Sequence, residues 1–464
     1  MPMRQEHGRS EADLAERAWI ALKNNQVEKN PEFGVQRRRI ALGGMTTVLL
    51  LIVALSLLLM LVRPRGIAEV YWVGSGAILL LLLRLVPLRL AGHAIAEGSD
   101  VYLFLTGMML LSELAREHGV FDWLAALALR GAEGSCVRLF GLVYGIGTLV
   151  TILMSNDATA VVLTPAILAV VRKARVQPLP YLFACALIAN AASFVLPISN
   201  PANLVVFRAG MPSLGQWLLA FALPSVLAIA ATYAALRWIY RKELRVAIEG
   251  SVPPEPLSSS GRLVLVGLGA TVALLLSASA LKMDLGLPTC LAALAVTAVV
   301  SIRARANPWR LAREISWATL ALVAGLFILV HAVESVGGLR VTQAWLNWAL
   351  RQAPVTGTFA TGFAVGVANN LVNNLPLGLI AGGTLQAAHA QGLIAHAVLI
   401  GVDLGPNLSI TGSLATILWL IALRKEGINV GFWKFLRVGV VAMPIALLAA
   451  LGGAIAMHLV RSAL

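Results

Sequence analysis

The chain has 464 residues, of which 59% are hydrophobic and 12% charged, and its mean hydropathy is +0.83. This composition excludes an ordinary soluble domain and indicates a protein that crosses the lipid bilayer many times. The net charge of +14 does not indicate a nucleic-acid partner, because the basic residues lie in loops between apolar segments. The three cysteines, Cys136, Cys185 and Cys290, have no neighbours at metal-ligand spacing, so we expect no metal site, no disulfide and no cofactor.

Apolar windows of about 20 residues predict five membrane crossings in the first half of the chain. A basic polar tail at 1–39 precedes them and is too polar to contain the apolar segment of a signal peptide. An amphipathic stretch at 120–130 is too short to cross and is expected to lie along the membrane interface. The crossings of this first repeat, residues 40–240, are predicted at 40–62, 67–83, 101–115, 178–208 and 212–240.

Two polar stretches interrupt the apolar sequence of the first repeat. Met-Ser-Asn-Asp at 154–157 divides a predicted hairpin at 137–171, and Pro-Ile-Ser-Asn-Pro-Ala-Asn at 197–203 interrupts the crossing 178–208. Lipid cannot hydrogen-bond a broken backbone, so such breaks are expected only where they are buried in protein or line a cavity.

A charged and then Pro- and Ser-rich linker at 241–262 separates the halves, and the pattern then repeats. The predicted hairpin at 356–388 contains four Asn residues within 369–374. The interrupted crossing at 392–422 contains a polar run at 402–413. The second repeat, residues 263–464, also has an amphipathic segment at 341–351 and crossings at 263–281, 286–302, 315–335 and 436–460.

Each half thus has five crossings and one broken hairpin, and an odd number of crossings inverts the second half relative to the first. The predicted fold is an all-α polytopic membrane protein with two inverted repeats, about ten crossings and two re-entrant hairpins. Counting each hairpin as two crossings gives twelve instead. We favour the re-entrant form because Asn-Asp and Asn-Asn tips suit a cavity at mid-membrane better than a loop in water.

The Lys and Arg residues of the loops predict the orientation, because cytoplasmic loops are enriched in them. In the ten-crossing arrangement they concentrate on the side that carries the linker 241–262, which we therefore expect to be cytoplasmic. The basic loops on this side lie at 172–175, 237–245, 303–313 and 424–425. The tail disagrees with this rule, since it carries the basic run 37–39 and yet is placed outside.

Asp157 is the most informative single residue, because an ionisable group inside a membrane costs about 2.5–3.5 kcal/mol on insertion scales. In a cavity its carboxyl group can gain and lose a proton, so we interpret it as the proton-coupling residue. The alternative is an Asp that caps the half-helix after it, and the two roles are compatible. Ser155 and Asn156 beside it are predicted to bind the solute.

The counterpart in the second hairpin is the pair Asn373 and Asn374, with Asn369 and Asn370 one turn earlier. Amide groups supply hydrogen-bond donors and acceptors without charge. We therefore predict that Asn373 and Asn374 bind the solute. The alternative is that these amides only satisfy the backbone of the hairpin.

The two interrupted crossings are expected to complete the site. Pro201 removes a backbone donor and disfavours helix for Asn200, which leaves a half-helix N-terminus facing the cavity. Asp403, beside a Gly-Pro pair, is a second proton-coupling candidate, with a helix cap near the interface as the alternative. The solute-binding residues predicted at the two breaks are Ser199, Asn200, Asn203, Thr411, Gly412 and Ser413.

Other charged residues lie near the ends of predicted crossings. His331 and Glu334 are one turn apart, either as a proton relay or as a satisfied pair at a helix end. Glu69, Arg84 and Glu113 are expected to reach the interface with their polar ends.

The run 401–420 (Gly-Val-Asp-Leu-Gly-Pro-Asn-Leu-Ser-Ile-Thr-Gly-Ser-Leu-Ala-Thr-Ile-Leu-Trp-Leu) resembles the C-terminal signature of arsenical pump membrane proteins. These are bacterial arsenite and antimonite efflux carriers of the ion transporter superfamily. Asn156-Asp157, with Leu-Thr-Pro at 163–165, resembles that family's Asn-Asp-Gly segment before its Leu-Thr-Pro. Asn-Asn-Leu-Pro at 373–376 resembles its Asn-Asn-Met-Pro. The resemblance extends from about residue 40 to the end of the chain.

The chain departs from the pattern of that family at three positions. Ala158 stands where the family usually has Gly, Val402 where Cys is frequent, and Asn407 where Lys is usual. Val402 argues against thiol ligation of a metalloid at that position, and Asn407 removes a cation near the site. The run 199–203 is closer to that of other members of the superfamily.

The resemblance implies efflux of trivalent arsenite or antimonite in exchange for protons across the bacterial inner membrane, alone or with a soluble ATPase partner. It also implies a superfamily in which homodimers are common. Arsenite near neutral pH is an uncharged trihydroxide, and Asn, Ser and Thr side chains both donate to and accept from hydroxyls. We expect Asp157, with Asp403 as the second candidate, to exchange a proton for the trihydroxide as the two hairpin bundles rock around the site.

Two other functions are the alternatives to metalloid efflux. A sodium-coupled carboxylate carrier or a sodium/proton carrier of the same superfamily is the alternative within transport, although Asp157 would repel a dianion. A membrane-embedded hydrolase needs a nucleophile and a base, and the His residues lie away from the four polar motifs. We therefore expect a transporter and not an enzyme.

Overall fold

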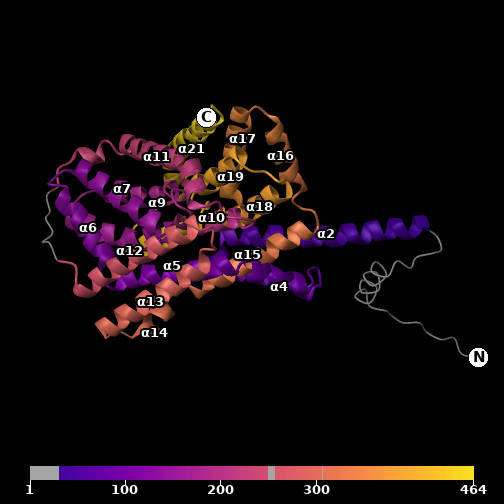
Figure 1. Ribbon diagram of the computed structural model, residues 1–464, viewed down its shortest axis with the longest axis horizontal. Coiled ribbons are helices and arrows are strands. Elements are labelled where there is room, and N and C mark those ends of the chain that lie inside the picture. Colours follow the sequence, from indigo (N-terminus) through magenta and orange to yellow (C-terminus); the bar gives the residue numbers. More distant parts are fainter. Residues whose placement is uncertain (1–30, 249–255, 306, 464) are drawn as a thin grey trace, which may run out of the picture.

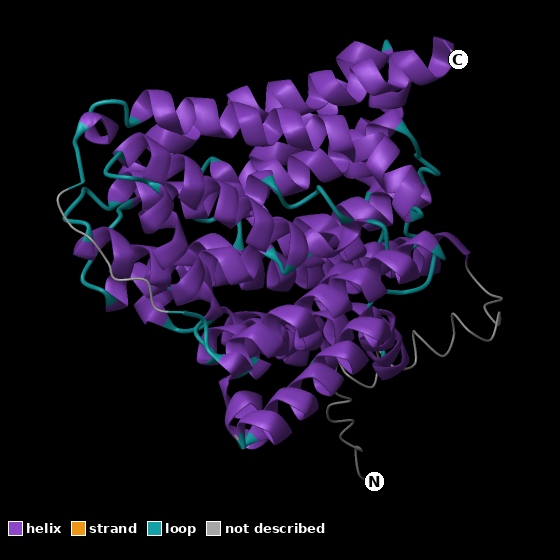
Figure 2. Ribbon diagram, turned by 60° about the vertical axis from the view of Figure 1, so that its left-hand side comes forward, coloured by secondary structure: helices purple, strands orange, loops and turns teal. Residues whose placement is uncertain are grey.

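The computed structural model describes residues 31–248, 256–305 and 307–463. Within these residues the regular structure is helical apart from one isolated bridge between Ser135 and Ala247. Figure 1 shows a bundle from which the N-terminal end of α2 projects, and Figure 2 shows that short loops join the helices. The prediction of an all-α polytopic protein is confirmed. Parts of the predicted tail and linker, 1–30 and 249–255, lie outside the described residues.

Both halves of the chain consist of helices (Figure 1). The first half comprises α2 (Pro31–Val62), η1 (Pro64–Gly66), α3 (Glu69–Leu82), α4 (Leu88–Glu97), α5 (Ser99–Glu117), α6 (Val120–Gly131), α7 (Cys136–Leu153), the π-helical turn η2 (Ala158–Leu163), α8 (Thr164–Lys173), α9 (Leu179–Ala191), η3 (Pro197–Ser199), α10 (Pro201–Val206), α11 (Leu214–Ile239) and η4 (Glu243–Arg245). The second half comprises α12 (Ser259–Ala280), α13 (Gly286–Ala304), α14 (Pro308–Glu314), α15 (Trp317–Ser335), α16 (Arg340–Arg351), α17 (Pro354–Val372), α18 (Asn374–Ala387), α19 (Leu393–Leu404), η5 (Gly405–Asn407), α20 (Leu414–Lys425) and α21 (Phe432–Ala463).

Among the described residues, seven helices are long and apolar enough to cross a membrane. They are the part of α2 from Gly44 onward, α7, α11, α12, α13, α15 and α21. Helices α4 and α5 pass the same test together as one segment bent by 47°. Helix α3, helix α9 and the segment Leu393–Asn407 are shorter apolar helices. These lengths fit a polytopic protein, while the count of ten crossings and the inversion of the halves stay predictions.

The helix breaks lie at the polar motifs, and local chemistry explains them. Pro165 has no backbone N–H, and the π-helical turn η2 comes directly before the helix that contains it. Pro201 and Pro406 likewise open α10 and η5. The segment 137–171, predicted as a hairpin, comprises α7, η2 and α8, and the segment 356–388 comprises α17 and α18.

The interrupted segments lie at the centre of the bundle, between outer helices that pack in pairs. Helix α11 packs on α21, α5 on α13, and α3 on α15, while α10 contacts α18 and α17 contacts both α19 and η5. The approach of α17 to η5 requires a glycine, because a Cβ atom at Gly405 would lie 2.5 Å from the carbonyl oxygen of Gly366. The polar breaks are thus enclosed by apolar helices.

The inverted arrangement predicts opposite sidedness for the ends of the two hairpins. In a background with Cys290→Ser, single cysteines replace four exposed residues, Glu133 and Lys173 beside the first hairpin and Ala353 and Gln391 beside the second. We expect a membrane-impermeant maleimide to label the second pair in intact cells and the first pair in everted vesicles. Labelling of both pairs from the same side would contradict the inversion, and labelling of all four after permeabilisation is the control.

Candidate functional site

The tip of the first hairpin lies between α7 and η2. Ser155 and Asn156 are buried, whereas Asp157 is partly exposed. The Ser155 hydroxyl accepts a hydrogen bond from the backbone N–H of Ala158 at 3.2 Å, which helps to begin η2. The Asp157 carboxylate makes no capping hydrogen bond to the turn that follows it. The capping alternative therefore does not account for Asp157.

The tip of the second hairpin is strained. Asn373 has φ +82°, ψ 154°, a combination that costs a residue other than glycine on the order of 1–3 kcal/mol and is held only where the surroundings enforce it. The contacts that enforce it come from the second break. The Asn373 amide donates to the Thr411 carbonyl at 3.2 Å, and the Asn374 backbone N–H donates to the Gly412 carbonyl at 3.0 Å.

The half-helices that follow the two breaks begin in the same way. The Asn200 side-chain oxygen accepts from the backbone N–H of Ala202 at 3.0 Å and begins α10. The Ser413 hydroxyl accepts from the backbone N–H of Ala415 at 3.1 Å and begins α20. Such caps satisfy backbone donors at a helix start that lipid could not satisfy. Asn200 and Ser413 are therefore fixed in place by their own helices.

Two cavities meet at Asp157. The tighter one, of about 10 Å³, has room for about one water molecule. The wider one, of about 140 Å³, has Ser155 and Asp157 in its wall and reaches the exposed residues Glu314 and Ser316. Polar residues from both hairpins and both breaks line the tighter cavity, namely Asn156, Asp157, Asn200, Asn374 and Ser413, together with Thr319 of α15.

The charged residues that line these cavities are all acidic. Asp157 lines both, Glu113 and Glu314 line the wider one, and Glu69 lines a third cavity of about 10 Å³ beside Asn373. Within the part of the chain that the structure describes, no Lys or Arg contributes to these three walls. The site can therefore offer amides, hydroxyls and carboxyl groups to a solute, but no cation.

Other predicted residues hold the breaks together instead of lining these cavities. The Asn203 amide donates to the Ser193 carbonyl at 2.9 Å, and the Ser199 hydroxyl donates to the Ile152 carbonyl at 3.0 Å. The Thr411 hydroxyl donates to the Asn370 carbonyl at 2.8 Å. These side chains satisfy backbone carbonyls that the broken helices leave unpaired.

Asp403 is fully buried near the C-terminal end of α19, so it does not cap the start of that helix. Its Oδ1 accepts a hydrogen bond from the Asn200 amide at 2.8 Å, across the two halves of the chain. Its Oδ2 has no partner among the described residues. Because Asn200 also lines the tighter cavity, Asp403 lies one side chain behind the wall of that cavity.

Asn190, which belongs to none of the four polar motifs, links the two interrupted helices. The Asn190 amide donates to the Asn407 side-chain oxygen at 2.9 Å, and the Asn407 amide donates to the Leu187 carbonyl at 3.0 Å. Asn190 and Asn407 are buried. A lone amide in the apolar segment 179–191 was the available signal. The partner could not be read from the sequence, because it is far away along the chain.

A family model described as a citrate transporter (CitMHS) matches residues 40–402. The chain belongs to this family. The CitMHS family is part of the ion transporter superfamily. The chain is also similar to curated arsenical pump membrane proteins. It is 26% identical over 409 residues to the one from Yersinia enterocolitica, covering 84% of this chain and 94% of that protein.

The similarity to the arsenical pump membrane protein of Escherichia coli (strain K12) is 26% identity over 407 residues, covering 84% of this chain and 94% of that protein. The crystal structure of the YdaH transporter of Alcanivorax borkumensis matches with a TM-score of 0.53 and 16% sequence identity, covering 79% of this chain and 86% of that one. The latter similarity concerns the fold alone. The expected resemblance to arsenical pump membrane proteins is confirmed, and so is the expectation of a transporter and not an enzyme.

The pair Asn190 and Asn407 generates a stability prediction. Truncating either residue to alanine leaves a buried partner unsatisfied, which costs about 1–3 kcal/mol. We expect Asn190→Ala and Asn407→Ala each to lower the thermal stability of the purified protein in detergent. The double variant should be less destabilised than the sum of the two single variants, because the second truncation removes a partner that is already lost. Strict additivity would contradict the coupling of the two interrupted helices through this pair.

Proposed function

We propose that this chain is a secondary active transporter that exports trivalent arsenite or antimonite, as the neutral trihydroxide, in exchange for protons. The observation that carries the proposal is the character of the cavity walls around Asp157. They present amides and hydroxyls, such as those of Asn156, Asn374 and Ser413, and their charged residues are acidic. A neutral trihydroxide needs groups that both donate and accept hydrogen bonds, and it needs no cation. The similarity to arsenical pump membrane proteins supports the same solute.

Asp157 is proposed as the group that carries the coupled proton. It lines both the wider cavity and the tighter one, so its carboxyl group is within reach of a solute in the wider cavity and of a water molecule or solute hydroxyl in the tighter one. Its carboxylate is not occupied by a helix cap. Protonation and solute binding can therefore compete at this position, and such competition is what exchange requires.

Asp403 is proposed to assist through Asn200. A fully buried carboxyl group with one hydrogen-bond donor is stable when it is neutral, or when an opposite charge compensates it. Asn200 joins Asp403 to the tighter cavity. A solute hydroxyl that binds Asn200 would change the hydrogen bond on which Asp403 depends.

The alternative proposal is a sodium-coupled carboxylate or sodium/proton carrier of the same superfamily. The description of the matching family as citrate transporters favours it. The acidic cavity walls oppose it, because a carboxylate solute would meet Asp157 with no Lys or Arg beside it in the walls that the structure describes. We therefore rank metalloid exchange first.

We also propose the membrane location, the orientation and the partners of this transporter. The basic loops and the linker 241–262 are placed in the cytoplasm, and the protein in the bacterial inner membrane. The wider cavity reaches Glu314, the last residue of the basic helix α14, so this cavity is proposed to open to the cytoplasm. A soluble ATPase subunit and a second copy of the chain are proposed as partners.

The central test is arsenite uptake into everted membrane vesicles that are energised by respiration. We expect the chain to drive uptake that an uncoupler abolishes, and Asp157→Asn to reduce this uptake to background. The matched control is Asp122→Asn, which makes the same substitution on the exposed face of α6 and should leave uptake unchanged. Full proton-coupled uptake by Asp157→Asn would contradict the role assigned to Asp157.

Sodium dependence separates the two proposals. We expect arsenite uptake in the same vesicles to persist when potassium replaces sodium, because the proposed exchange uses only protons. Citrate transport that requires sodium, together with no arsenite uptake by a well-expressed protein, would favour the carboxylate carrier.

A further inference from the structure

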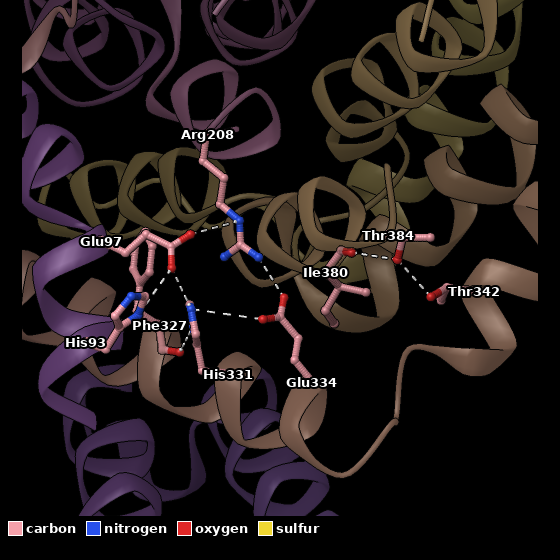
Figure 3. A network of polar contacts seen from close by, with 9 residues as sticks. All are labelled: His93, Glu97, Arg208, Phe327, His331, Glu334, Thr342, Ile380 and Thr384. Atoms are coloured by element: carbon pink, nitrogen blue, oxygen red, sulfur yellow. Dashed lines mark hydrogen bonds and ion pairs between the residues drawn. The ribbon is translucent and has the colours of Figure 1, made fainter. Parts of the chain in front are cut away.

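A second polar cluster lies apart from the cavities around Asp157 (Figure 3). It is built by His93 and Glu97 on α4, by His331 and Glu334 on α15, and by Arg208 just after α10. None of these residues lines the three cavities described above. His331 and Glu334, predicted as a relay or a satisfied pair, are joined in the structure by a histidine and a carboxylate from α4 and by Arg208.

The spacing along the two helices directs these side chains to one place. His93 and Glu97 are four residues apart, and His331 and Glu334 are three apart, so each pair lies on one helix face. Figure 3 shows the side chains of the two helices pointing toward one another. One ligand atom from each of His93, Glu97 and His331 lies within 4.8 Å of the other two.

His331 is oriented as a ligating histidine usually is. Its Nδ1 lies 2.9 Å from the backbone carbonyl oxygen of Phe327, to which it donates, and the ring is almost fully buried. A hydrogen bond of this kind fixes the ring and turns the other nitrogen toward the ligand position. The Nε2 atom therefore faces Glu97, with an Nε2–Oε2 distance of 2.7 Å.

This contact brings together two atoms that carry lone pairs, the Nε2 atom of His331 and the Oε2 atom of Glu97. With Nδ1–H directed to Phe327, the neutral ring offers a lone pair at Nε2, and Glu97 offers a carboxylate oxygen. A cation is needed between them, and either a proton or a metal ion can supply it. Arg208 does not supply it, because its guanidinium contacts the other oxygen of Glu97 at 3.4 Å and Glu334 at 2.6 Å.

We propose that His93, Glu97 and His331 form a binding site for a divalent transition-metal ion of the zinc type, with Glu334 as an adjacent carboxylate. Two imidazoles and one carboxylate are a ligand set that zinc, cobalt and nickel accept, whereas calcium and magnesium prefer oxygen ligands. Zinc holds such atoms tetrahedrally at about 2.0–2.2 Å, so its ligand atoms are about 3.3–3.6 Å apart. The His331 Nε2 and Glu97 Oε2 atoms, 2.7 Å apart, would separate to admit the ion. The side chain of His93 is 74% exposed and can rotate to close the remaining gap.

Occupation of this site would join α4 to α15. The Oε2 atom of Glu334 lies 4.0 Å from the His331 Nε2 atom, close enough to become a fourth ligand. Glu334 would then be shared between the metal and Arg208, which follows the interrupted helix of the first half. The ion would thus act on the connection between α15 and α10, at a distance from the solute site.

The test uses the full-length protein without a histidine tag, purified into lipid nanodiscs, and Co²⁺ as the probe. We expect one Co²⁺ to bind and to give visible absorption bands of a nitrogen- and oxygen-ligated ion. Zinc should displace it, and magnesium and calcium should not. We expect His93→Gln and His331→Gln each to weaken binding at least tenfold, while His118→Gln, outside the cluster, binds as the parent protein does.

Absence of Co²⁺ binding to the parent protein, or unchanged affinity in both cluster variants, would overturn the proposal. His93 is exposed, so His93→Gln keeps the test decisive if His331→Gln does not fold. The readout does not depend on transport. A protein that binds Co²⁺ but moves no arsenite would contradict the proposed function alone, and the reverse result would contradict the metal site alone.

Discussion

The structure depends on one constraint, which is that an apolar surrounding cannot satisfy the backbone groups of a broken helix. The chain contains two hairpin tips and two interrupted helices, and each leaves N–H and C=O groups in the middle of the bundle. Side-chain amides and hydroxyls pair with these groups. Asn203 and Thr411 bind carbonyls within their own half, and Asn370 accepts from both the backbone N–H and the hydroxyl of Ser409. Most side chains of the polar motifs therefore pair with backbone groups of the broken helices. Only some of these side chains remain available to bind a solute.

The side chains that pair with backbone groups also determine which chemical groups line the cavity. Side chains that also cap helices, such as Asn200 and Ser413, are fixed in the cavity wall by their own half-helices. The strained Asn373 is held by the second break, which sets the position of Asn374 in the tighter cavity. A site assembled in this way is rigid and rich in neutral hydrogen-bonding groups. Among the residues that the structure describes, Asp157 alone brings a charged group to the wall of the tighter cavity.

The sequence predicts the positions of the breaks well because their causes are local. A proline without an N–H that stands in a polar run within apolar sequence signals a break, as at Pro201 and Pro406. Pro224 and Pro444 stand in no such run and lie inside the long helices α11 and α21. Which side chains meet across the halves is not local. The hydrogen bonds from Asn200 to Asp403 and from Asn190 to Asn407 join residues far apart in the chain, so no spacing rule could indicate them. No pattern in the sequence indicated that Thr319 of α15 lines the tighter cavity.

Asn407 illustrates the difference between a local pattern and its structural meaning. Against the arsenical pump pattern it counts as the loss of a cation, which suggests a changed site. In the structure it is a fully buried amide that accepts from Asn190 and donates to Leu187, and it lines none of the three cavities. A lysine there would need a partner for its charge in this buried position, and an asparagine does not. The substitution therefore concerns how the two interrupted helices are joined, and it leaves the walls around Asp157 composed of the same neutral and acidic groups.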